Sequence, residues 1–190
     1  MDEQFEAEQQ RVMGTLEPYF DRITNIYSGA VDQYNTETSP KARAEHDTRA
    51  ALCAIYSYAW KGLMREFDDE PGFRSMTVRG LNVLNIRDVI VMRAKHVDAN
   101  GHHANHDSKQ QRDFDRQLSI PGLPPAAVRL VVGYNLDPAF SQVERVIVRR
   151  PLGKWTAWSA QIVSLGDLMA WQDITPARFS FGPGLRAARG

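Results

Sequence analysis

The stretch at residues 87–118, RDVIVMRAKHVDANGHHANHDSKQQRDFDRQL, reads as a strand, a polar loop and a short helix. In its first third, apolar residues alternate imperfectly with polar ones, and this period of two predicts a strand. Asn100-Gly101 predicts a turn, because both residues tolerate positive φ. Ser108, with Gln111 three residues later, matches a capping box and predicts the start of a helix. We therefore expect a strand and a helix joined by a loop rich in histidine.

A cluster of basic and amide side chains is expected where this strand ends and this helix begins. Arg93 and Lys95 leave the same face of the strand, about 7 Å apart along it. A helix N-terminus favours anions, so the segment predicts an anion-binding site. The candidate ligand-binding residues are Arg93, Lys95, Lys109, Gln110 and Arg112.

The same segment holds four of the five histidines of the chain and allows two further interpretations. In an enzyme, His96 or His106 would act as general base while Arg93 and Lys95 hold a phosphate. The candidate metal ligands are His96, Asp98, His102 and His106. Their spacing matches no recognised metal motif, and a solvated polar loop is the interpretation that we favour. We expect no cofactor, with a divalent metal as the alternative.

The rest of the chain predicts an α+β fold. Apolar residues at steps of three and four predict a helix over residues 3–34, with Pro18 as a point of kink or restart. Ser39-Pro40 predicts the start of a second helix that runs to about Phe67, and the two helices form an antiparallel helical hairpin. Residues 165–171 read as a short helix, and residues 73–86 are ambiguous between a short helix and a turn.

Three strands with short turns follow the opening stretch, over residues 127–134, 143–150 and 155–163. Together with the opening strand they predict a mostly antiparallel sheet of about four strands, with one short helix packed on it. Gly133 marks a bulge or a close backbone approach. The expected divisions are a helical hairpin over residues 1–72, a sheet region over 73–174 within the same domain, and a flexible Arg/Gly/Pro tail over 175–190.

Composition narrows the function classes. The formal net charge is 0, which argues against a generic polyanion binder, so charge does not indicate nucleic acid as a partner. The charge is uneven, however: residues 1–86 hold 9 Lys/Arg against 14 Asp/Glu, and residues 87–154 hold 11 against 7. Cys53 is the single cysteine, expected as a buried thiol, so the chain reads as cytoplasmic. No signal peptide or membrane-spanning run is expected.

The pattern RDVIVMRAKHVD, N105–D107, QQRDFDRQLSIPGLP, LVVGYNLD, VERVIVRRP and W155 resembles a family of small uncharacterised bacterial proteins over about residues 75–163. Their genes often neighbour a helix-turn-helix regulator that carries a metallopeptidase-like domain. The resemblance implies a component of a two-gene toxin–antitoxin or phage-defence module, and it assigns no catalytic residue.

Two function classes and one structural role remain open. The first is a cytoplasmic bacterial protein-binding component of such a module, with a partner encoded nearby. The second is a metal- or histidine-dependent hydrolase that acts on nucleic acid or a nucleotide through the loop at residues 96–107. The third is a homodimer that forms through the N-terminal helices.

Overall fold

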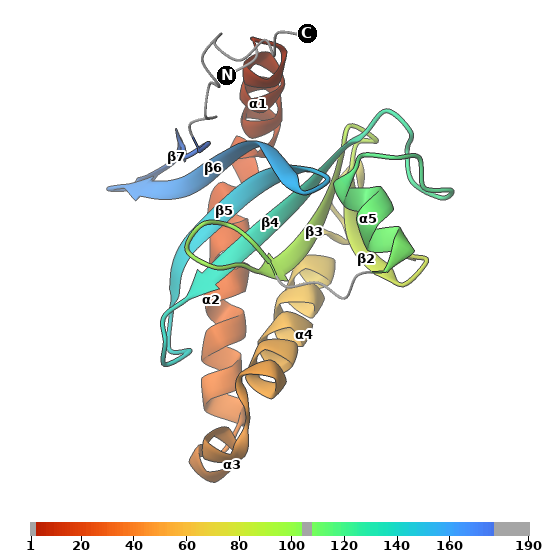
Figure 1. Cartoon of the computed structure of the whole chain (residues 1–190). Helices are drawn as coiled ribbons and strands as arrows, with labels where there is room; N and C mark the ends of the chain where they lie inside the picture. Colours follow the sequence, from red (N-terminus) through yellow and green to blue (C-terminus); the bar gives the residue numbers. More distant parts are fainter. Residues whose placement is uncertain (1–2, 104–107, 177–190) are drawn as a thin grey trace, which may run out of the picture.

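The computed structural model of the chain describes residues 3–103 and 108–176 (Figure 1). Its helices are α1 (Glu3–Leu16), the 3-10 helix η1 (Glu17–Tyr19), α2 (Phe20–Glu37), α3 (Pro40–Glu45), α4 (Thr48–Phe67) and α5 (Lys109–Asp115). Its strands are β1 (Phe73–Val78), β2 (Leu81–Ile86), β3 (Ile90–His96), β4 (Val128–Leu136), β5 (Val143–Leu152), β6 (Trp155–Leu165) and β7 (Leu168–Asp173).

The strands form one mixed sheet of seven strands, in the order β1-β2-β3-β4-β5-β6-β7. Every neighbouring pair is antiparallel except β3 and β4, which run parallel. The α+β class holds, but the expected sheet of about four mostly antiparallel strands with one short helix packed on it is wrong. The four expected strands are present as β3 to β6, and three more strands extend the sheet at its two edges.

The additional strands come from segments in which apolar and polar residues alternate only weakly. Residues 73–86 form the hairpin β1–β2, whose turn contains Arg79 and Gly80 at positive φ. Residues 165–171, expected as a helix, contribute to the hairpin β6–β7, which turns at Gly166 with φ +66°. In both cases the pairing with a neighbouring strand, rather than local propensity, determines the structure.

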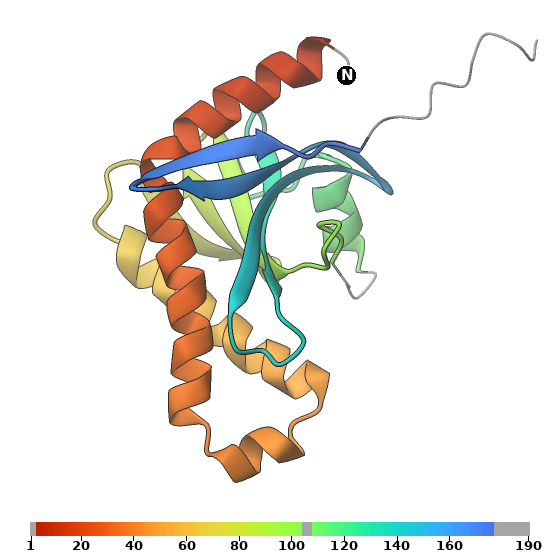
Figure 2. The same cartoon turned by 90° about the vertical axis from the view of Figure 1, so that its left-hand side faces the viewer.

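Helices α1, α2 and α4 cover one face of the sheet. Figure 2 shows α1 and α2 as one long, bent rod, and the bend lies at η1, where Pro18 restarts the helix as expected. Ser39 caps α3 through the backbone N–H of Ala42, so the predicted Ser-Pro helix start is confirmed. The expected single helix to about Phe67 is wrong, because α3 ends at Glu45 and Asp47 caps a new helix, α4, through the N–H of Ala50. Fully buried Tyr27 and Trp158 join the helices to the strands in one hydrophobic core.

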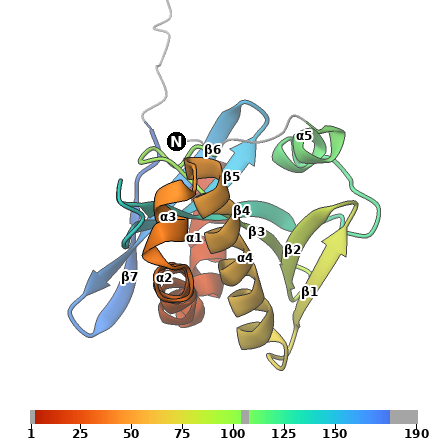
Figure 3. The same cartoon turned by 90° about the horizontal axis from the view of Figure 1, so that it is seen from below.

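Helix α5 lies on the opposite face of the sheet, as the view in Figure 3 shows. The predicted cap is confirmed, since the Ser108 hydroxyl accepts from the backbone N–H of Gln111. Phe114 is completely buried in a second, smaller core with Val83 and Val91. Leu118 lies beyond the end of the helix and is 48% exposed.

The crossover from β3 to β4 begins with a close backbone approach. Gly133 of β4 lies under Val97, the first residue after β3, whose N–H donates to the Tyr134 carbonyl. A Cβ at position 133 would lie 2.4 Å from Val97 Cγ1. The expected close approach at Gly133 is confirmed, because only a residue without a side chain lets Val97 turn back over β4.

We predict that Gly133→Ala lowers the free energy of unfolding by about 1–3 kcal/mol, the usual cost of overpacking a core. Urea denaturation measures this loss. Val97→Ala in the same chain should recover part of it by removing the methyl groups that clash. Gly14→Ala serves as the control, since nothing lies within 4 Å of a Cβ at that position. Equal stability of Gly133→Ala and the wild type would contradict the close approach.

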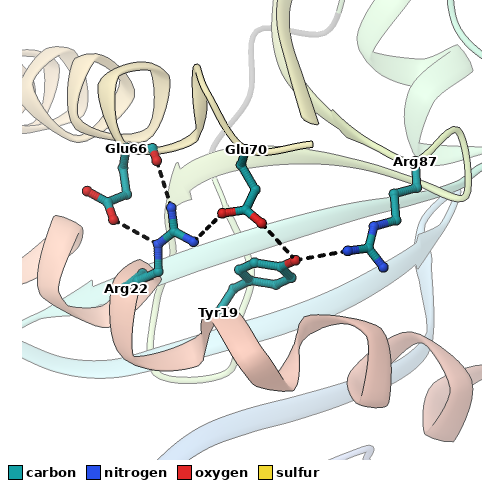
Figure 4. A network of polar contacts seen from close by, with 5 residues as sticks. All are labelled: Tyr19, Arg22, Glu66, Glu70 and Arg87. Carbon is teal, nitrogen blue, oxygen red and sulfur yellow. Dashed lines mark hydrogen bonds and ion pairs between the residues drawn. The ribbon is translucent and has the colours of Figure 1, made fainter. Parts of the chain in front are cut away.

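A polar network joins the helices to the β2–β3 turn (Figure 4). The Arg22 guanidinium of α2 donates to Glu66 at 2.7 Å and to Glu70 at 2.6 Å. Tyr19 donates its hydroxyl to Glu70 at 3.4 Å and accepts from Arg87 at 3.2 Å. Arg87 has φ +53°, so the network holds a strained turn against the helical layer.

We predict that Glu70→Gln destabilises the protein at neutral pH but not at low pH. The hydrogen bond from Arg22 holds the pKa of Glu70 below its ordinary value. A carboxylate with a lowered folded pKa stabilises the protein above its unfolded pKa, near 4.3, and the effect disappears as pH falls through the folded value. Urea denaturation from pH 7 to pH 3 measures it, with Asp69→Asn as the control. A constant difference between Glu70→Gln and wild type over that range would contradict this assignment.

Two further features concern the surface. None of the helices in the described ranges is long and apolar enough to cross a membrane.

Cys53 of α4 is exposed, so the expectation of a buried thiol is wrong. The side chains of Ala51, Ile55 and Ala59 face the core on this helix, and position 53 falls between them on the outer side.

Candidate functional site

Three basic side chains meet on the face of the sheet that α5 covers. Arg93 and Lys95 come from β3 and Arg149 comes from β5. In the sheet register, Val131 of β4 pairs with Arg93 on one side and with Arg149 on the other. The two arginines therefore lie two strand spacings apart, about 10 Å between their Cα atoms. We call Arg93, Lys95 and Arg149 the basic cluster.

Helix α5 supplies the polar side chains that face the basic cluster. Arg93 donates to the Gln111 side-chain oxygen, and Gln111 donates to Asp115 at 2.9 Å. Asp115 attracts all three cations of the cluster. The Arg93 guanidinium also lies 5.3 Å from the centre of the Phe114 ring, a cation–π contact. One helix thus brings an amide, a carboxylate and an aromatic ring to three positive charges.

The end of α5 is fastened to the strands below it. Gln117, at φ +59°, donates to the Arg129 carbonyl at 2.9 Å and to the Pro151 carbonyl at 3.1 Å, and accepts from the Arg129 N–H at 3.0 Å. The Gly153 N–H donates to the Asp115 carbonyl at 2.7 Å. These bonds fix the position of Asp115 relative to β4 and β5.

Burial shifts the pKa values of the groups in and around the basic cluster. Arg93 and Arg149 are each 6% exposed, and burial lowers the pKa of both guanidinium groups. Lys95 is half-buried, and its pKa falls to about 8 through burial and repulsion from Arg93. Burial raises the pKa of Asp115, and this effect exceeds the opposing hydrogen bond from Gln111 and the attraction of the three cations. The cluster therefore holds partly desolvated charge of mainly one sign.

The loop after β3 closes one side of the cluster through a compact turn. The Asp98 carboxylate accepts from the N–H groups of Asn100 and His102, and the Asp98 N–H donates to the His102 carbonyl at 2.7 Å. Gly101, at φ +77°, packs against Ile147 of β5. His103 follows, and its pKa falls to about 3 through burial and repulsion from the cations of the cluster. A neutral imidazole therefore borders the cluster at pH 7.

The residues proposed as a site from the sequence do not all converge. Arg93 and Lys95 share a face, as expected, but His96 lies on the other face, with its ring 6.1 Å from that of Tyr134 in the helix-covered core. Lys109 is exposed and pairs with Asp113 at 3.6 Å. Gln110 is half-buried and Arg112 exposed, both on α5.

The candidate metal ligands are likewise separated. Asp98 lies 3.7 Å from His102, in an exposed contact within the turn, while His96 lies across the sheet. His106 lies outside the described residues. Within residues 3–103 and 108–176, no group of three or more His, Cys, Asp or Glu side chains is arranged to hold a metal ion. A cation beside His103 would also meet repulsion from the basic cluster.

Three members of the site were not singled out from the sequence: Arg149, Asp115 and His103. Alternation along β5 carried a signal for Arg149, since Val146 and Val148 point to the helix-covered core and Arg149 to the other face. Asp115 follows Gln111 at the helical spacing of four residues, which places both side chains on one side of α5. Recognition of these signals required the knowledge that α5 packs on the face that carries Arg93.

Comparisons with known proteins identified no relative: no family model, no curated protein and no solved structure matches the chain.

We predict that Asp115→Asn changes how stability depends on pH. An acid whose folded pKa is raised weakens the native state as pH rises from its unfolded value, near 4, through the folded value. The wild type should therefore gain stability relative to Asp115→Asn as pH is lowered from 7 to 4. Urea denaturation of both proteins measures the difference, with Asp113→Asn on the same helix as control. The opposite trend would show that the three cations outweigh burial.

Proposed function

We propose that the chain binds an anionic ligand, and that the basic cluster is its binding site. One observation carries the proposal: the buried Arg93 and Arg149 and the half-buried Lys95 converge on Asp115, the carboxylate that attracts all three. Arg149 is also attracted by Asp98, which is exposed, so among the described residues three positive charges face two negative charges and leave an excess of one when all are ionised. Buried charge without a partner is costly, so an entering anion would relieve a cost already present in the fold.

The hydrogen-bonding state of the cluster supports the same ligand class. The Arg93 Nε is buried and has no hydrogen-bond partner among the described residues, while its Nη1 is used by Gln111. Arg149 uses its Nε to bond the Thr156 hydroxyl at 2.6 Å, which fixes the orientation of its guanidinium plane. Oriented guanidinium groups with an adjacent ammonium suit an oxyanion such as a phosphoryl or carboxylate group.

The hydrophobic surroundings would strengthen such binding. Val97, Val131 and Ile147 form a small core beside the cluster, and each is at most 1% exposed. Charge-assisted hydrogen bonds are stronger where water is excluded, because the effective dielectric constant is lower. Lys95 and Asp115, which are only half-buried, would form the side of the cluster that a ligand reaches first.

The roles expected from the sequence stay predictions beside this proposal. A protein-binding component of a two-gene module would bring an acidic group of its partner to the cluster. The hydrolase would need a general base at the cluster. Of its two candidates, His96 lies on the opposite face of the sheet and His106 lies outside the described residues. Anion binding is the common requirement of both roles, and it is therefore the function that we propose.

Titration with inorganic phosphate, followed by calorimetry, tests the proposal. We predict that Arg149→Gln weakens phosphate binding at least about tenfold, since a hydrogen bond to a charged group contributes about 1.5–3 kcal/mol. Arg65→Gln, on the exposed surface of α4, should bind as the wild type does. Binding should weaken as pH rises through about 8, where Lys95 loses its proton, and Lys95→Arg should remove that dependence. Equal affinity in the wild type and Arg149→Gln would refute the assignment.

A further inference from the structure

The edge of the sheet at β7 is unprotected. Among the described residues, β7 pairs with β6 alone, so its other side is a free edge (Figure 1). Natural proteins usually protect such an edge with lysine, proline or a bulge, which prevents pairing with another chain. The sequence of β7, LMAWQD, contains no lysine, arginine or proline, and its pairing with β6 has no register shift. At the opposite edge, β1 carries the exposed ion pair of Arg74 with Asp88.

Apolar side chains are exposed beside this free edge. Leu168, the first residue of β7, is 74% exposed, and Leu165, which pairs with it across the turn from β6, is 65% exposed. Among the large hydrophobic side chains of the described residues, only Trp155 is more exposed than these two. Unpaired backbone groups and exposed leucines therefore occur together on one hairpin, and a further strand would cover both.

The geometry of the hairpin determines which residues of β7 bond outward. The two-residue turn at Gly166 and Asp167 makes Leu168 bond β6, and the Ile174 N–H donates to the Ser159 carbonyl of β6 at 3.0 Å. In an antiparallel pair only every second residue bonds the neighbouring strand, so the even-numbered residues from 168 to 174 bond β6. The N–H and carbonyl groups that point to the free edge belong to Met169, Trp171 and Asp173.

A second copy of β7 fits this edge when the two strands run antiparallel about a two-fold axis at Trp171. The three outward-bonding residues of each chain then face one another, as hydrogen bonding requires. Met169 lies opposite Asp173 of the second copy, and the two Trp171 side chains form a cross-strand aromatic pair. The exposed Leu168 lies opposite Ile174 of the second copy, so an apolar residue meets an apolar residue. Each contact occurs twice, because the interface is symmetric.

Charge and length disfavour the neighbouring registers. An axis at Ala170 would place Asp167 opposite Asp173 of the second copy, and like charges in directly opposed positions are destabilising. An axis at Gln172 would carry Leu168 past Ile174 of the second copy to Pro176, which is exposed. The axis at Trp171 therefore combines full strand overlap with separation of the acidic residues.

We propose that the chain forms a homodimer in which β7 pairs with β7 of a second copy and the two sheets become one. Self-pairing is favoured because the strand is complementary to itself: Asp173 is its only charged residue, and the two-fold axis places that residue opposite Met169 rather than opposite itself. The symmetry also closes the assembly, since each chain uses its one unprotected edge. The pairing involves no residue of the basic cluster and goes beyond the proposed function.

Sedimentation equilibrium of the full chain over a range of concentrations tests the dimer. We expect a reversible dimer of the 21.5 kDa chain. Its Kd should be on the order of micromolar, because one pair of short strands forms a small interface. Met169→Glu should raise the Kd about tenfold relative to Met169→Lys, since both symmetric contacts with Asp173 change from attraction to repulsion. The two variants replace the same half-buried side chain, so their effects on folding are matched.

The exposed position 172 provides the control for charge on the strand. Gln172 faces Ala170 of the second copy, so Gln172→Glu and Gln172→Lys should have similar Kd values. Hydrogen exchange of the wild type needs no variant. The N–H groups of Met169, Trp171 and Asp173 should exchange more slowly above the Kd than below it, whereas those of the residues that bond β6 should be protected at both concentrations.

Three results would overturn the β7 dimer. The first is a chain that stays monomeric at every concentration, with exchange at Met169, Trp171 and Asp173 independent of concentration. The second is a dimer with equal Kd in Met169→Glu and Met169→Lys, which would assign the contact to another surface such as the N-terminal helices. The third is an open-ended assembly, which would indicate pairing between β7 and β1. Circular dichroism and thermal unfolding of each variant establish that it is folded.

Discussion

The parallel hydrogen bonding between β3 and β4 is the constraint on which the candidate site depends. Antiparallel neighbours need only a tight turn, whereas parallel neighbours require the chain to travel back along the sheet before the next strand begins. Here the return path passes over Gly133, makes the turn at Asp98 and forms α5 before Val128 pairs. Because that path crosses the face carrying Arg93 and Lys95, the crossover itself buries these cations and brings Asp115 to them.

The half-exposed Arg22 and the buried Arg93 differ in how well their positive charges are matched by nearby acceptors and carboxylates. Arg22, in the network that ties α2 to the end of α4, donates to two carboxylates and to the Glu66 carbonyl, so its charge is well matched. Arg93 is far more buried, yet it bonds an amide and shares one carboxylate with two other cations. The ion pairs of Arg22 with Glu66 and Glu70 hold α2 against the end of α4. An under-matched charge in the interior is costly to the fold, which is why we propose this group as part of a binding site.

Local chemistry in the sequence was a good guide to local structure. The caps at Ser39 and Ser108, the restart at Pro18 and the close approach at Gly133 depend on neighbouring residues alone, and each was predicted. The four strands β3 to β6 were also predicted, because the alternation of residues within one strand depends on neighbouring residues alone. The remainder of the sheet was missed because the hairpins β1–β2 and β6–β7, which carry its outer strands, show weak alternation of apolar and polar residues.

Only the part of the candidate site that depends on neighbouring residues in the chain could be predicted from the sequence. Arg93 and Lys95 were placed on one face correctly, since period two within a single strand is local information. His96, one residue further, was grouped with them by proximity in sequence, although alternation turns it to the other face. Arg149 and Asp115 reach the cluster through the strand order and the crossover, both of which required the sheet topology.

The exposure of Cys53 gives this chain one addressable thiol, and α4 places it on the helical side of the molecule. With no other cysteine in the sequence, a maleimide reagent would react at a single position. Immobilisation through that position would hold every molecule in the same orientation, with α5 directed toward the bulk solution. A fluorophore in its place would report on the helical layer while leaving the opposite face chemically unchanged.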